Sequence, residues 1–184
     1  KALNKLPLKL NKRCGISCTF QRGIMAKAKR REHDYYPTPE YCIQSLFSVI
    51  DFKNLKDEMT FAEPCRGEAQ AIYKHLPEGS QYCELSEGKD YLKSTWEQRP
   101  DCIITNPPFS LAVEFLEKSL GEADVSIYLL RLGFLESKVR LGFHQKNPVN
   151  HLIVLSKRPS FTGNGRTDGT GYAWFVYDPK GKLG

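Results

Sequence analysis

Cys-Ile-Ile-Thr-Asn-Pro-Pro-Phe, residues 102–109, combines a short apolar run with an abrupt proline turn. The apolar and β-branched residues 102–105 predict a buried strand. Asn106-Pro107-Pro108-Phe109 must end that strand, because proline has a fixed φ and no backbone donor. We expect the carbonyls of this turn to point outward without internal partners. A stiff turn at this position matters for function, since parallel α/β sheets bind their ligands beyond the carboxyl ends of their strands.

The segments on either side extend the same pattern. Apolar runs predict further strands over residues 60–63, 81–85, 125–130, 151–156 and 172–177. Helical spacing of apolar residues, or a turn followed by a helix-forming run, predicts helices over residues 38–50, 68–76 and 110–120. Thr38, followed by Pro39, is expected to cap the first of these helices. Strands that alternate with helices indicate an α/β fold, a mostly parallel sheet with helices on both faces.

Charge is unevenly distributed along the 184 residues. The first 33 residues hold 10 of the 27 Lys and Arg residues but only one of the 21 acids, so the remainder carries a net charge of −3. We therefore expect a basic tail over residues 1–33, disordered and outside the fold, and a catalytic domain over residues 34–184. Residues 1–24 precede the natural-looking start at Met25, and we interpret them as a tag, a readthrough product or a misplaced reading frame.

The chemistry of the proline turn can be read from its residue types. The Asn106 amide oxygen and the Pro107 carbonyl are two acceptors on a rigid frame, which suits the two donors of a planar NH2 group. Phe109 can stack on the ring that bears this amine. Accepting both hydrogen bonds localises the nitrogen lone pair, so the amine can attack an electrophilic methyl group by positioning and electrostatics.

This tetrapeptide resembles the NPPF/NPPY motif of S-adenosylmethionine-dependent amino-methyltransferases, in particular the phage-type DNA N6-adenine methyltransferases. The resemblance spans roughly residues 34–178 in the family's motif order. It implies a Rossmann-like class I methyltransferase fold, S-adenosylmethionine as cofactor, and DNA as the main partner. It assigns catalytic roles to Asn106, Pro107, Pro108 and Phe109.

The resemblance also implies a cofactor site. Thr38-Pro39 matches a PTP motif at the cofactor's methionine end, and Phe61–Gly67 matches the first cofactor motif, although the usual second glycine is Ala69. Glu84 is expected on the ribose, Asp90 on the adenine amine, and Tyr91 beside that ring. The expected cofactor-binding residues are Thr38, Pro39, Glu63, Pro64, Gly67, Glu84, Asp90 and Tyr91. Because Glu84 and Asp90 are six residues apart, no crossover helix fits between them, which predicts a trimmed connection with the third strand short or absent.

Arg158–Phe161 and Tyr172–Tyr177 resemble the family's last motifs, in which an aromatic residue faces the target base. Phe161 is therefore a candidate to stack on a flipped adenine, with Arg158 beside it. A core role for Phe161 is an equal alternative. The basic stretch 131–166 is either a phosphate-facing patch or an ordinary solvated face. An RNA base amine or a protein glutamine amide are alternative acceptors, and an inactive nucleic-acid-binding relic is the alternative to an enzyme. Neither a metal site nor a membrane span is expected, and we expect a location in the cytoplasm of a bacterial or phage-infected cell.

Overall fold

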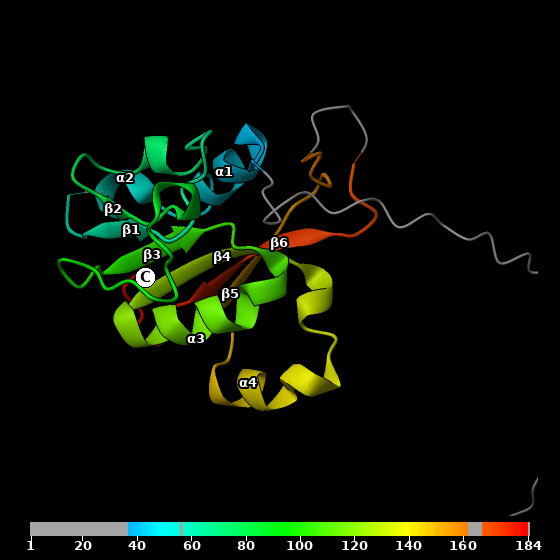
Figure 1. Cartoon of the computed structure of the whole chain (residues 1–184). Coiled ribbons are helices and arrows are strands. Elements are labelled where there is room, and N and C mark those ends of the chain that lie inside the picture. The colour runs from blue at the N-terminus through cyan, green and yellow to red at the C-terminus, as the bar shows by residue number, and fades with distance from the viewer. Residues whose placement is uncertain (1–36, 56, 162–166, 184) are drawn as a thin grey trace, which may run out of the picture.

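A single six-stranded sheet organises the protein (Figure 1). The computed structural model describes residues 37–55, 57–161 and 167–183. The strands follow the spatial order β2-β1-β3-β4-β6-β5. Their bounds are β1 Phe61–Glu63, β2 Gln81–Tyr82, β3 Cys102–Thr105, β4 Val125–Arg131, β5 His151–Val154 and β6 Tyr172–Tyr177.

The sheet is mostly parallel, as the alternation of strands and helices predicts. Strand β1 pairs in parallel with β2 and with β3, and β3 pairs in parallel with β4. Only β6 runs the other way, between β4 and β5. The central strands β3 and β6 are buried along their whole length, which explains why their sequences are continuous apolar runs rather than alternating ones.

Helices cover both faces of the sheet, which confirms that prediction (Figure 1). On one face α1, Glu40–Phe47, buries Ile43 and Leu46, and the short α2, Phe52–Leu55, lies on the same side. On the other face α3, Ala112–Glu122, buries Phe115 and Leu116. Apolar residues at helical spacing turn one stripe of each helix to the sheet, and this burial is the main source of stability.

Trp174 ties the first face together. Its ring is fully buried in the middle of β6, and its indole N–H donates a 2.7 Å hydrogen bond to the Cys42 carbonyl in α1. A buried tryptophan needs such an acceptor for its polar edge. The contact joins residues 132 positions apart and fixes α1 against the sheet.

The segment between β1 and β2 differs from the sequence prediction. The helix expected over residues 68–76 is wrong, because only Tyr73–His75 is helical there, as a single 3₁₀ turn. Gly67 and Gln70 both adopt positive φ, 63° and 47°, which breaks an α-helix, and Pro77 follows the turn. The predicted strand over 81–85 is also shorter, ending at Tyr82.

The trimmed connection between β2 and β3 is present. A single 3₁₀ turn, Leu85–Glu87, is the only helical element there, and no strand lies between Glu84 and Asp90. The segment that follows is instead fixed to α3, because Tyr91 and Trp96 both donate hydrogen bonds to Glu122. Both acids therefore stay close to the carboxyl end of β2.

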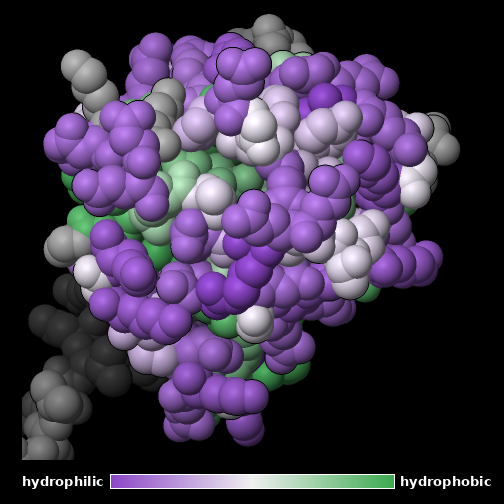
Figure 2. All heavy atoms as spheres, turned by 90° about the vertical axis from the view of Figure 1, so that its left-hand side faces the viewer, coloured by the Kyte–Doolittle hydropathy of each residue, from purple (hydrophilic) through white to green (hydrophobic). Residues whose placement is uncertain are grey.

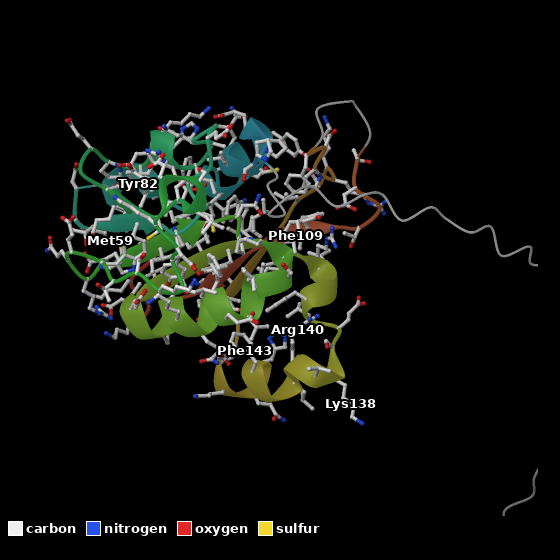
Figure 3. All side chains as sticks on the ribbon, viewed as in Figure 1. Met59, Tyr82, Phe109, Lys138, Arg140 and Phe143 are labelled. Atoms are coloured by element: carbon white, nitrogen blue, oxygen red, sulfur yellow. The ribbon has the colours of Figure 1, made fainter. Side chains whose placement is uncertain are left out.

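Between β4 and β5 the chain makes an excursion that the sequence analysis did not predict. It carries 3₁₀ turns at Leu132–Phe134 and Lys138–Arg140 and the short helix α4, Leu141–Lys146. In Figure 3 α4 lies beyond α3, and Lys138 projects away from the body. Arg140 holds the excursion together, donating to the carbonyls of Phe134 at 2.7 Å and Gly133 at 2.9 Å.

The helices within the described ranges are too short to cross a membrane. The side of the molecule shown in Figure 2 is mainly hydrophilic, with the largest visible group of hydrophobic residues in one recess and smaller groups elsewhere. The glycine-rich stretch of residues 163–171 lies partly outside the described residues. Residues 167–171 form neither helix nor strand.

Candidate active site

A cavity of about 380 Å³ opens at the carboxyl ends of β1, β2 and β3. This is the position at which parallel α/β sheets hold ligands, and the volume is in the range of small-molecule sites. Most of the residues predicted from the sequence line it: Thr38, Glu63, Pro64, Gly67, Glu84, Asp90, Tyr91, Asn106 and Pro108. The other five, Pro39, Pro107, Phe109, Arg158 and Phe161, are not in its wall.

Glu63, the last residue of β1, is the most unusual group in the cavity. Its side chain is only 1% exposed, and within the described part of the chain its Oε2 has no hydrogen-bond partner. Burial raises the pKa of this carboxyl well above its usual range, the nearby Glu84 charge adds to the effect, and the Tyr73 amide and Arg66 oppose it. An unpaired buried oxygen in a cavity wall fits a ligand that brings a positively charged donor.

Glu84 stabilises the turn that follows β1. Its carboxylate accepts hydrogen bonds from the Gly67 amide at 2.7 Å, from the Ser86 amide at 3.0 Å and from the Ser86 hydroxyl at 2.7 Å. Burial would raise its pKa, but these hydrogen bonds and Arg66 outweigh that effect, so the pKa is lowered. Glu84 is therefore an anion at neutral pH. Gly67 takes its left-handed φ in this turn, where any other residue would be strained.

Asp90 and Tyr91, in the loop that follows β2, form another part of the cavity wall. Asp90 pairs with Lys93 at 3.0 Å and accepts from the Leu92 amide at 3.1 Å. The hydrogen bond from Lys93 is the largest cause that lowers the pKa of Asp90. Tyr91 is 2% exposed, and its hydroxyl donates to Glu122 of α3 at 3.0 Å. The loop that replaces a crossover helix is thus fixed to α3.

Arg66 is a cavity residue that the sequence analysis did not identify. Its guanidinium stacks 3.7 Å from the centroid of the Tyr82 ring and pairs with Glu87. Its charge helps to lower the pKa of Glu84 and opposes the burial effect on Glu63. The signal was present in the sequence, since Arg66 is the one basic residue in the 61–67 motif. Only the fold, however, brings Tyr82 and Glu87 to it.

Asn106 enters the cavity directly after β3. Its amide nitrogen donates to the Thr38 hydroxyl at 3.1 Å, a contact between residues 68 positions apart. This bond fixes the rotation of the Asn106 amide and turns its oxygen to the side opposite Thr38. Thr38 was expected to cap the first helix, but Pro39 occupies the N-cap position and no side chain caps it. Thr38 is buried, and its hydroxyl instead accepts the hydrogen bond from the Asn106 amide.

The two prolines behave differently. The expectation that the carbonyls of this turn point outward without internal partners is wrong for Pro108, whose carbonyl accepts from the Leu111 amide at 2.9 Å and so begins the 3₁₀ turn Phe109–Leu111. Pro107 is buried, and among the described residues no donor reaches its carbonyl. Of the two carbonyls, Pro107 is thus the one that can pair with Asn106 as an acceptor.

Phe109, labelled in Figure 3, belongs to an aromatic cluster beside the cavity. Its ring contacts those of Phe161 and Tyr172, which also contact each other. The Phe109 and Phe161 rings meet at 62° with centroids 6.1 Å apart, an edge-on contact rather than two parallel walls. Phe161 is 7% exposed and belongs to the core cluster on the α1 face. The structure therefore brings the two aromatic candidates together but does not form a slot for a base between them.

The basic stretch separates into two groups. Arg131 and Arg140 are held by internal hydrogen bonds. Arg131 is nevertheless exposed, as are the other described cations Lys138, Lys146, Lys157 and Arg158. Arg158 follows β5, at the same edge of the sheet as Asn106, but it lies outside the cavity. Arg166 lies outside the described residues. The described part of the chain contains no group of His, Cys, Asp and Glu side chains that could hold a metal ion.

Comparison with solved structures places this fold among the class I S-adenosylmethionine-dependent methyltransferases. A protein of Pyrococcus horikoshii assigned as an RNA methyltransferase is similar over 79% of this chain and 87% of its own, with 14% identity and a TM-score of 0.61. A dimethyladenosine transferase of Plasmodium falciparum is similar over 79% of this chain and 64% of its own, with 13% identity and a TM-score of 0.55.

A further protein, assigned as a class I methyltransferase of Listeria monocytogenes, matches 79% of this chain and 61% of its own, with 12% identity and a TM-score of 0.51. The chain thus spans less than two thirds of the second and third of these proteins. No protein-family profile and no curated protein sequence matches it. The chain has the Rossmann-like α/β fold of class I methyltransferases.

Proposed function

We propose that this chain transfers a methyl group from S-adenosylmethionine to the exocyclic N6 amine of adenine in DNA. One observation carries the proposal: a single cavity joins the acids of the cofactor motifs with Asn106 of the proline turn. These residues come from three different strand ends, and a purely structural turn after β3 would not require them to meet.

The cavity residues fit the cofactor. The unpaired Glu63 oxygen would accept from its ammonium, Glu84 from its ribose hydroxyls, and Asp90 from its adenine amine, with Tyr91 beside the ring. Thr38, Pro64 and Gly67 would complete the wall around it, and Pro39, outside the wall, would hold Thr38 in place at the start of α1. When bound, the cofactor supplies a methyl group made electrophilic by its sulfonium. Glu84 would have to release some of its present hydrogen bonds, such as the one from the Gly67 amide, to make these contacts.

On the acceptor side, Asn106 and the Pro107 carbonyl would accept the two hydrogen bonds of the adenine amine, while Phe109 would stack on its ring. Pro108 holds the turn through Leu111. The amine nitrogen forms the new bond to the methyl carbon as the carbon–sulfur bond breaks, and the amine then loses a proton to water. Because the amine must approach in line, the adenine has to leave the DNA helix. Phe161 would have to turn to contact it on a second face, and Arg158 would contact a phosphate.

RNA is the second candidate acceptor, since one similar solved structure is assigned as an RNA methyltransferase. The likeness of the 34–39 and 158–177 segments to phage-type enzymes favours DNA. A protein glutamine amide presents the same planar NH2 and is the third possibility. From the same resemblance we infer that the reaction occurs in the cytoplasm of a bacterial or phage-infected cell.

The test is incubation with tritiated S-adenosylmethionine and separate pools of DNA, RNA and protein. We expect label in DNA, recovered as N6-methyladenine on nucleoside analysis. Label in another pool would reassign the acceptor. Absence of label together with no thermal shift from saturating S-adenosylhomocysteine would identify an inactive relic, because a ligand that binds the native state must raise its stability.

A further inference from the structure

Arg131 is a charged residue beside the proline turn that the proposed function does not use. It is the last residue of β4, the strand next to β3, so its side chain starts at the same edge of the sheet as Asn106. Its guanidinium carbon lies 4.8 Å from the centroid of the Phe109 ring. Arg131 does not line the cavity. Arg131 therefore approaches the proposed acceptor site only through its contact with Phe109.

Two directed hydrogen bonds hold this guanidinium in place. Arg131 Nε donates to the Tyr172 hydroxyl at 2.9 Å, and Nη2 donates to Asp168 Oδ2 at 3.3 Å. The Tyr172 hydroxyl itself donates to the same Asp168 oxygen at 2.6 Å. Tyr172 is fully buried at the start of β6, so the network is anchored in the sheet. Three elements thus meet on one guanidinium: β4, β6 and the loop before β6.

The network has a direct effect on the Phe109 ring. A cation over an aromatic face is attracted by the ring quadrupole. The guanidinium therefore favours one orientation of the Phe109 ring. Tyr172 contacts the same ring from another direction, with centroids 5.6 Å apart. Both neighbours of Phe109 are themselves joined by a hydrogen bond. The ring is therefore held before any acceptor arrives.

We propose that Arg131, oriented by Asp168 and Tyr172, is a positioning residue that fixes the Phe109 ring for the acceptor. This inference rests on the proposed function, in which Phe109 stacks on the ring that bears the reacting amine. A planar acceptor can be brought in line with the methyl group only if the aromatic ring under it keeps one orientation. Loss of orientation of this kind lowers the rate of the chemical step more than the affinity for the acceptor.

The informative variants are Arg131→Gln, Arg131→Lys and Asp168→Asn. Glutamine removes the charge over the ring, whereas lysine keeps a charge but cannot make both directed bonds from a planar fork. The structure supplies a matched control, an arginine ion pair at the opposite end of β4. Arg99 pairs with Asp124 at 2.8 Å, directly before β4, and its side chain is 54% exposed against 46% for Arg131.

Steady-state methyl transfer to DNA is measured for each variant, with S-adenosylhomocysteine affinity by calorimetry and thermal unfolding alongside. We expect Arg131→Gln to lower kcat by about tenfold to a hundredfold, with the KM for DNA and the ligand Kd within about twofold of the unaltered chain. Asp168→Asn should move kcat in the same direction, and Arg131→Lys should recover it in part. Arg99→Gln should leave kcat unchanged.

An unchanged kcat in Arg131→Gln would overturn the inference. An equal loss of kcat in Arg99→Gln would overturn it too, because the loss would then be a general effect of removing a surface ion pair. A rise in KM alone would assign Arg131 to acceptor binding and overturn the positioning role. An unaltered chain that labels no acceptor overturns the proposed function and this inference together, whereas an active chain with an unaffected Arg131→Gln overturns this inference only.

Discussion

Replacing Glu63 by glutamine tests the cavity most directly, because the stability and the ligand affinity should change in opposite directions. Glu63 is 1% exposed, its Oε2 has no partner among the described residues, and burial raises its pKa well above the ordinary value of 4.5. Glutamine has nearly the same shape and carries no titratable proton. The substitution therefore removes a charge while keeping most of the contacts.

The effect on stability follows from proton linkage. Over the pH window between 4.5 and the raised pKa, the native state keeps the Glu63 proton while the unfolded chain has lost it. Rising pH in this window therefore favours unfolding, by at most about tenfold in the equilibrium constant per pH unit for one proton. The loss stops above the folded pKa. Relative to the unaltered chain, Glu63→Gln should become progressively more stable as the pH rises through that window.

The effect on ligand affinity has the opposite sign. A hydrogen bond to a charged group contributes about 1.5–3 kcal/mol, so Glu63→Gln should bind S-adenosylhomocysteine roughly tenfold to a hundredfold more weakly. In the unaltered chain the ligand's ammonium requires the ionised carboxylate. Its affinity should therefore rise with pH through the same window, and the affinity of the variant should not.

The assay is thermal unfolding between pH 5 and pH 8, with and without S-adenosylhomocysteine, and calorimetry at both ends of the range. Glu117→Gln is the matched control, since Glu117 is an exposed glutamate of α3 outside the cavity. It should track the unaltered chain throughout. If Glu63→Gln binds the ligand with unaltered affinity, or if its stability relative to the unaltered chain does not depend on pH, the assignment of Glu63 to the ligand's ammonium is wrong.

Three further substitutions separate the parts of the molecule. Asn106→Ala removes an acceptor for the amine and should lower methyl transfer by at least about a hundredfold, measured with tritiated cofactor, while ligand affinity survives. Asp90→Ala should weaken S-adenosylhomocysteine binding by roughly tenfold in calorimetry, because a carboxylate at the cavity wall is lost. Trp174→Phe removes the indole hydrogen bond to the Cys42 carbonyl and part of a fully buried ring, and should cost about 1–3 kcal/mol of unfolding free energy in urea denaturation.

Each of these has its own check. Lys93→Gln breaks the ion pair to Asp90 but leaves the carboxylate, so it should bind ligand nearly as the unaltered chain does. Asn106→Ala with full activity would contradict the catalytic assignment, and Asp90→Ala with unaltered affinity would remove that residue from the site. Trp174→Phe should leave ligand affinity unchanged once the protein is folded, since Trp174 is not in the cavity wall.

Much of the fold could be predicted because the signals are local. A buried central strand must be apolar on both faces, so β3, β4 and β6 are visible as apolar runs. Proline ends a central strand for steric reasons, which places Asn106 at a strand end. The six-residue spacing of Glu84 and Asp90 excludes a crossover helix by length alone.

Other features depend on backbone conformations that the sequence does not specify. The segment 68–76 has helix-forming residues, yet Gln70 takes a positive φ and the α-helix does not form. The reversal of β6 and the α4 excursion depend on how the chain returns to the sheet after β4. Tertiary contacts commonly override local propensity in this way.

The sequence alone thus determined which residues stand at strand ends and which chemical groups they carry, since strand periodicity and the geometry of proline act within a few residues. Only the tertiary structure decided which of these groups meet. The hydrogen bond from Asn106 to Thr38, the stacking of Arg66 on Tyr82 and of Arg131 on Phe109, and the burial that raises the pKa of Glu63 all join or enclose residues from different elements. The order of strands in the sheet sets these contacts, and that order follows from packing the whole chain into one core.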